Sequence, residues 1–149
     1  MFIVSQLICF LTKIFLWDSI NISSMNIEFG PDRKLEDVQK DFNGAFPFLK
    51  LEFAMANKKN NSTDAARVLS NIENLTIGDL NKNIHPGSVE IPENMTVFEL
   101  EKIFTNKIEM PVRVLRKSGN IWMGTSITNN WTLSQQNEHG KEISTSKVF

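Results

Sequence analysis

The sequence predicts an α+β domain built on a β-α-β unit that occurs twice. An alternating apolar segment at residues 27–29 recurs at residues 89–91, an offset of 62 positions. After each segment, apolar residues recur at spacings of three and four, which is typical of one face of a helix. Two such units suggest a ferredoxin-like split arrangement, four antiparallel strands backed by two helices, with an added C-terminal hairpin strand. A β-grasp-like sheet is the alternative.

The composition is that of an ordinary globular domain. The chain has 149 residues, of which 41% are hydrophobic and 22% charged, and this fits a single domain. The net charge of -1 gives no sign of the basic surface that nucleic-acid binding needs. The only cysteine is Cys9, so residues 25–149 lack thiols for disulfides, zinc sites or catalysis. We expect a cytoplasmic protein.

Residues 1–24 are a doubtful N-terminal extension. Residues 1–17 are mostly apolar, but no basic residue precedes them, Lys13 interrupts them and no small-residue cleavage site follows. A clean strand begins at Met25. The segment therefore reads as translated upstream sequence, as a signal or anchor, or as an extra helix. Membrane anchoring or export is expected only if residues 1–17 belong to the mature protein.

The two central helices follow from apolar residues that share one face. The first face consists of Leu35, Val38, Phe42 and Phe46, and the second of Val97, Leu100, Phe104 and Ile108. Thr96 and Glu99 have the spacing of a capping box, in which a hydroxyl and a carboxylate satisfy free helix N–H groups. The first helix has only Asp32 or Lys34 at its start. Pro47 and Pro111 fall where each helix should end.

The linker between the units contains further helix signals. Spacing within residues 63–72 predicts one or two helical turns, and Thr76 with Asp79 forms a second capping box. Thr76, Thr96 and Thr132 also complete N-x-[ST] sequences, but helix capping explains these threonines better than glycosylation.

The repeated pattern ends near Val114, and the residues that follow form a distinct addition. Residues 112–117 and 121–128 predict a hairpin around a two-residue turn at Ser118-Gly119. Thr132 opens a short helix or turn. We expect the domain to span residues 25–137, with a loose polar tail at residues 138–149.

The sequence provides no recognisable catalytic or metal-binding pattern. The only histidines, His85 and His139, have no acidic neighbours at ligand spacing. Nucleophile elbows and glycine-rich phosphate loops are absent. We therefore expect no metal, no cofactor and no nameable catalytic residue. An enzyme would have to rely on carboxylates, lysine or threonine.

The hairpin carries the most suggestive surface. If Val112 and Val114 face the helices, then Arg113, Leu115 and Lys117 face the open side of the sheet, with Trp122 opposite Leu115. This surface, together with Trp131, predicts a binding or regulatory module that contacts a protein partner. Single-stranded nucleic acid, held by stacking and cation-π contacts, is the alternative. A packing role is also open, because Trp131 and Leu133 could fold over the face and bury Trp122. The oligomeric state is not predicted.

The same stretch resembles a family of small bacterial proteins of unknown function. The resemblance rests on the motif V-x-R-K-S-G-N-x-W at residues 114–122 and W-T-L-x-x-Q-N at residues 131–137. It extends to residues 46–50 and 96–101, and it covers residues 25–137. Asn129-Asn130 departs from the acidic pair expected before the tryptophan. The resemblance implies a start near Met25 and implies no activity.

Overall fold

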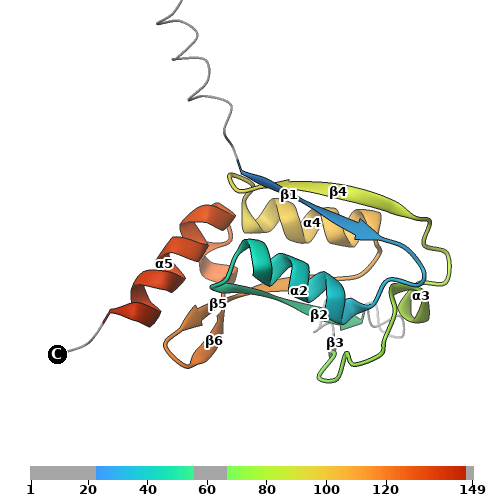
Figure 1. The fold of residues 1–149 in the computed structure, drawn as a ribbon, viewed down its shortest axis with the longest axis horizontal. Coiled ribbons are helices and arrows are strands. Elements are labelled where there is room, and N and C mark those ends of the chain that lie inside the picture. Colours follow the sequence, from blue (N-terminus) through green and yellow to red (C-terminus); the bar gives the residue numbers. More distant parts are fainter. Residues whose placement is uncertain (1–22, 56–66, 147–149) are drawn as a thin grey trace, which may run out of the picture.

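Two strand–helix–strand units follow one another along the chain (Figure 1). The computed structural model describes residues 23–55 and 67–146. The first unit consists of β1 (Ser24–Phe29), α2 (Leu35–Ala45) and β2 (Leu49–Met55), and the second of β4 (Gly87–Pro92), α4 (Val97–Lys107) and β5 (Val112–Ser118). The predicted α+β class is confirmed.

The first strands of the two units pair with each other, and so do the second strands. In the antiparallel pair β1–β4, Ile27 lies opposite Val89, and in the antiparallel pair β2–β5, Leu51 lies opposite Val114. A short strand β3 (Arg67–Val68) pairs antiparallel with the end of β2. β6 (Ile121–Gly124) pairs with β5, as expected. The interleaved elements are compatible with a ferredoxin-like fold. They differ from the single sheet we expect, because the strands form two antiparallel sheets, β1-β4 and β3-β2-β5-β6.

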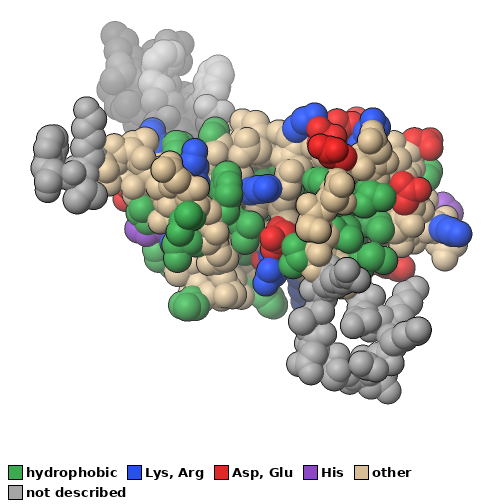
Figure 2. Space-filling view, turned by 90° about the horizontal axis from the view of Figure 1, so that it is seen from below, with side chains coloured by type: hydrophobic (Ala, Val, Ile, Leu, Met, Phe, Trp, Pro, Cys, Tyr) green, Lys and Arg blue, Asp and Glu red, His purple; other side chains and the backbone are tan. Residues whose placement is uncertain are grey.

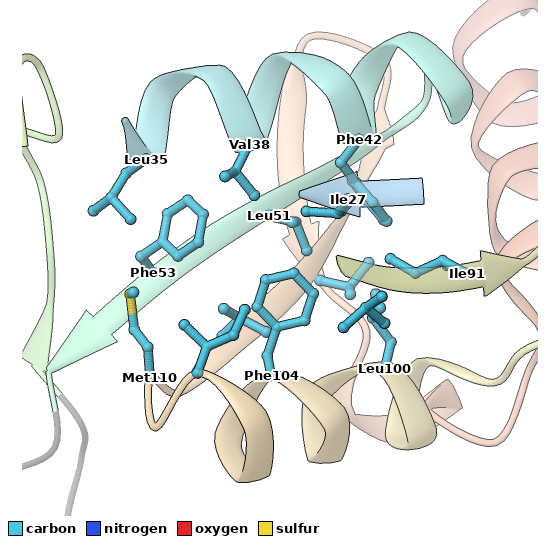
Figure 3. Packing of buried hydrophobic residues seen from close by; sticks show 14 of the residues in the cluster. Ile27, Leu35, Val38, Phe42, Leu51, Phe53, Ile91, Leu100, Phe104 and Met110 are labelled. Atoms are coloured by element: carbon cyan, nitrogen blue, oxygen red, sulfur yellow. The ribbon is translucent and has the colours of Figure 1, made fainter. Parts of the chain in front are cut away.

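The hydrophobic core lies between α2 and α4, which approach it from opposite sides (Figure 3). Every residue of the two predicted helix faces is buried. The strands add side chains that point between the helices, among them Ile27, Leu51, Phe53 and Ile91. The apolar faces of the helices and of the strands therefore meet in one core, and the burial predicted from their spacing is confirmed.

Three capping boxes fix the starts of three helices. The Thr96 hydroxyl accepts the Glu99 N–H at 3.2 Å, and the Glu99 carboxylate accepts the Thr96 N–H at 2.8 Å. The same reciprocal bonds start α3 (Ile77–Leu80) at Thr76 and α5 (Leu133–Thr145) at Thr132. The predicted capping role of all three threonines is confirmed. α2 starts at Lys34 without a side-chain cap.

The chain after β5 has a counterpart after β2. The first amide of α2, on Leu35, donates to the Leu75 carbonyl, and the first amide of α4, on Val97, donates to the Trp131 carbonyl. The next bonds also match, from Ile77 to Arg33 and from Leu133 to Met95. The segment around Thr76 therefore bonds to the start of α2, and the segment around Thr132 bonds in the same way to the start of α4. The structural correspondence between the two halves therefore extends beyond Val114, where we expect the β-α-β sequence pattern to end.

Two further expectations differ from the structure. Of residues 63–72, where we expect one or two helical turns, residues 63–66 lie outside the described residues. Residues 67–68 form β3 instead of a helical turn, and the Leu69 amide donates to the Phe53 carbonyl of β2. α5 continues to Thr145, so most of the predicted loose tail is helical. Of the doubtful extension that we place at residues 1–24, residues 1–22 lie outside the described residues, and Ser24 is the first residue of β1. Within the described residues, no helix is long and apolar enough to span a membrane.

Replacing Phe104 by alanine should lower the free energy of unfolding by about 3–5 kcal/mol, because its ring is only 1% exposed in the core. Phe98→Ala is the matched control on the same helix, since Phe98 is 54% exposed, and it should cost less than about 1 kcal/mol. Urea unfolding of both variants measures the difference. Equal losses would contradict the described placement of α4.

Candidate binding surface on the β5–β6 hairpin

One face of the sheet formed by β2, β5 and β6 is open. Val112 and Val114 are buried in the core, so the alternation of the strand turns Arg113, Leu115 and Lys117 to the opposite side. The structure confirms this part of the prediction. Arg113 is exposed, while Leu115 and Lys117 are half-buried among their neighbours on the sheet.

Trp122 lies on this open face, but in a different register from the predicted one. The turn occupies Gly119 and Asn120 instead of Ser118 and Gly119, and Gly119 has the positive φ of 61° that such a turn favours. Trp122 therefore lies opposite Lys117 instead of Leu115. The shift moves the pairing by one position on each strand, which leaves Trp122 on the expected face.

α5 packs on the other side of the sheet and is held there through Arg116. The Arg116 Nη1 donates to Gln136 Oε1 at 2.7 Å, and Gln136, which is 0% exposed, donates to the Thr128 carbonyl at 2.7 Å. The Arg116 guanidinium also lies 5.9 Å from the centre of the Trp131 ring. Trp131 is therefore part of the attachment of α5 and does not belong to the open face.

Two more contacts complete the attachment of α5. The Phe48 amide donates to Asn137 Oδ1 at 2.9 Å, and the Gly119 amide donates to Ser144 Oγ at 3.2 Å. Leu133 is fully buried in the core. The alternative in which Trp131 and Leu133 cover Trp122 is wrong. Of the predicted site residues, the structure brings together Arg113, Leu115, Lys117 and Trp122 and separates Trp131 from them.

The open face carries two cations without a carboxylate partner. The Lys50 ammonium lies 6.0 Å from the centre of the Trp122 ring, within the range of a cation-π contact. Arg113 is paired with Glu52 at 2.8 Å. Among the described residues, neither Lys50 nor Lys117 forms a salt bridge. A shallow hollow of about 250 Å³ lies beside Trp122, between α2 and the sheet.

Exposed hydrophobic side chains gather at this end of the molecule. Seven large hydrophobic residues of the described chain are exposed, and five belong to the hairpin, the turn after it and α5: Ile121, Trp122, Met123, Ile127 and Ile143. Ile127 is 97% exposed. Figure 2 shows hydrophobic side chains interspersed with basic ones in the half of the molecule that contains the hairpin. Only Trp122 of these five was predicted. The uncharged strand β6 is the signal that indicates Ile121 and Met123, whereas Ile127 and Ile143 lie outside it.

Two side chains terminate the pairing of β6 with β5. Beyond Gly124, the Val114 amide donates to the Glu101 carboxylate at 3.1 Å, and the Val114 carbonyl accepts from the Thr125 hydroxyl at 2.8 Å. Both backbone groups of Val114 are thus satisfied without a strand partner. Burial raises the pKa of Glu101, and the bond from the Val114 amide partly offsets that rise.

The other polar groups do not form a catalytic arrangement. A larger hollow of about 560 Å³ contains Asp79 and Glu109, but both side chains are exposed, and Asp79 already serves a capping box. Among the described residues, no group of three histidine, cysteine or acidic side chains could hold a metal ion. His139 lies on α5, and its ring makes an edge contact with Trp131.

Comparisons of the chain with protein-family models, with curated proteins and with solved structures found no match. The resemblance to a bacterial family therefore remains a prediction. The surface has to be interpreted from its own residues, namely the open sheet face, the unpaired lysines and the exposed apolar side chains.

Gly140→Ala should destabilise the protein, although alanine normally favours a helix. An added Cβ would lie 2.9 Å from Phe48 Cβ and 3.1 Å from Arg116 Cγ, and such crowding costs about 1–3 kcal/mol. Gly44→Ala in α2 meets no atom within 4 Å and should stabilise by up to about 1 kcal/mol. Thermal unfolding of both variants measures the two signs. If Gly140→Ala were also stabilising, the described contact of α5 with residues near β2 would be incorrect.

Glu101→Gln should retain the acceptor for the Val114 amide and remove the burial of a charge. Because the pKa of Glu101 is raised in the folded protein, the ionised group disfavours folding. The wild type should therefore gain stability relative to Glu101→Gln as the pH falls from above the raised pKa toward the ordinary value. Urea unfolding at several pH values measures this difference. A pH-independent difference between the two proteins would exclude the raised pKa.

Proposed function

We propose that this protein is a small binding module that contacts a protein partner through the β5–β6 hairpin. The observation that carries the proposal is the concentration of exposed apolar side chains on and after β6, beside an open sheet face with Trp122 at its edge. Several large apolar side chains exposed on one strand and the segments beside it mark interaction sites more often than isolated exposed residues do. We also propose a cytoplasmic location, because residues 25–149 contain no cysteine.

The side chains of the surface suit protein recognition. Tryptophan is enriched among the residues that contribute most binding energy, and Trp122 is flanked on one face by Lys50 and Lys117. The surface is anchored by the rigid attachment of α5 on the opposite side. A preformed surface loses less conformational entropy on binding than a mobile one.

Single-stranded nucleic acid is the second candidate, because Lys50 and Trp122 form the cation–aromatic pair that nucleic-acid platforms use. Charge argues against it. Glu52 neutralises Arg113, and Glu36 pairs with Lys40. Within residues 23–55 and 67–146, this leaves Lys50 and Lys117 as the cations of the face that have no carboxylate partner. Two cations can neutralise few phosphates, and phosphate neutralisation provides most of the affinity for nucleic acid.

The test is affinity capture from a lysate of the source organism with the full chain, the Trp122→Ala variant and Phe98→Ala as the matched control. Phe98 is an exposed aromatic residue on a different element, α4. We expect a set of proteins that binds the wild type and Phe98→Ala after nuclease treatment, and that Trp122→Ala loses. Capture of the same set by Trp122→Ala, or loss of the set after nuclease treatment, would contradict the proposal.

A further inference from the structure

β6 forms an open edge of its sheet. In the order β3-β2-β5-β6, it is the last strand, and all four of its residues are exposed. Natural edge strands are commonly protected by charged residues or proline, which oppose the pairing of another strand. β6 contains neither, since its sequence is Ile-Trp-Met-Gly.

The hydrogen-bonding groups on the open edge can be assigned from the neighbouring strands. The Lys117 amide donates to the Phe48 carbonyl on the β2 side, so Lys117 and Trp122 form a pair without mutual hydrogen bonds. The amide and carbonyl of Trp122 therefore point away from β5, and the alternation assigns the same direction to those of Gly124. No hydrogen bond described among residues 23–55 and 67–146 uses these groups.

The two sides of the edge differ in chemistry. Trp122 lies on the face that carries Lys50 and Lys117, neither of which forms a salt bridge among the described residues. Ile121 and Met123 point to the other side, the side of α5, because Met123 pairs with Arg116. A strand added to β6 would place alternate side chains beside Trp122, on the face that carries the lysines, and beside these apolar residues.

We propose that β6 accepts an extended segment of a partner protein in which acidic and apolar residues alternate. The segment adds as a further strand by bonding to the backbone of Trp122 and Gly124. Its acidic side chains lie beside Trp122, on the face that carries Lys50 and Lys117, and its apolar side chains cover Ile121 and Met123. A second copy of the chain fits less well, because it would bring the same unpaired lysines together instead of acidic groups. This inference rests on the proposed function and specifies the partner's chemistry.

The test uses two blocked eight-residue peptides, one alternating glutamate with valine and one alternating lysine with valine. Binding to the full chain is measured by titration, and amide hydrogen exchange is measured by NMR. We expect the glutamate peptide to bind at least about tenfold more tightly than the lysine peptide. We also expect it to slow exchange at Trp122 and Gly124, whose amides have no partner in the described part of the chain.

Gly124→Pro removes one outward amide and should weaken binding of the glutamate peptide at least about tenfold. Gly124→Ala is the matched control and should bind as the wild type does, since a Cβ there meets no atom within 4 Å. Retained slow exchange at Ile121 and Met123 verifies that the proline variant still pairs β6 with β5.

Three results would overturn this inference. The first is peptide binding that shifts the Trp122 indole signal without slowing exchange at Trp122 and Gly124. That result shows face contact without strand addition and leaves the proposed function intact. The second is failure of both peptides in a protein whose Trp122-dependent capture of partners succeeds. The third is concentration-dependent protection of the two amides in the free protein, which identifies a second copy as the occupant.

Discussion

The antiparallel pairing of β2 with β5 determines which side chains of this protein are buried and which remain available to a partner. Leu51 opposite Val114 and Phe53 opposite Val112 put four apolar side chains into the core. Because side chains alternate along a strand, the same register puts Lys50 and Leu115, and Glu52 and Arg113, on the opposite face. A shift of one residue would exchange the two sets and expose the core.

The position of α5 follows from that register. Arg116 shares the inner side of β5 with Val114, where it reaches Gln136 and the ring of Trp131. Gln136, which is itself fixed by Thr128, accepts from Nη1 of the Arg116 guanidinium, whereas the buried Nε of Arg116 has no hydrogen-bond partner among the described residues. α5 therefore covers the inner side of the hairpin, and the outer face with Trp122 stays uncovered by the described chain. The motif at residues 114–122 and 131–137 therefore serves mainly to attach α5. The candidate binding surface lies on the opposite face of the sheet.

Much of the fold could be predicted from local patterns. The apolar faces of α2 and α4, the three capping boxes and the burial of Val112 and Val114 depend on residues close together in sequence, so their spacing is sufficient. The division of the strands between two sheets depends on contacts between distant residues, and periodicity contains no information about them. β3 was not predicted, because the apolar spacing within residues 63–72 favours a helix. Residues 67–68 form a strand because they pair with the end of β2.

The candidate site was predicted only in part for the same reason. Alternation along β5 was enough to place Arg113, Leu115 and Lys117 on one face. The face of the sheet on which Trp131 lies could not be predicted. It depends on the contact of Arg116 with Gln136 on α5, which is 20 residues away in sequence. The continuation of α5 to Thr145 was not predicted, because polar residues dominate its last turns. Asn137 and Ser144 hold α5 by contacts with Phe48 and Gly119, and no local spacing indicates such contacts.

The central claim is that β6 is an edge strand with one side paired and the other open. Amide hydrogen exchange of the free full chain at low concentration tests this claim residue by residue. The structure predicts slow exchange at Ile121 and Met123, which bond to β5, and fast exchange at Trp122 and Gly124, which point outward. Equal protection of all four amides in the dilute protein would contradict the account, because it would mean that another part of the chain already covers this edge.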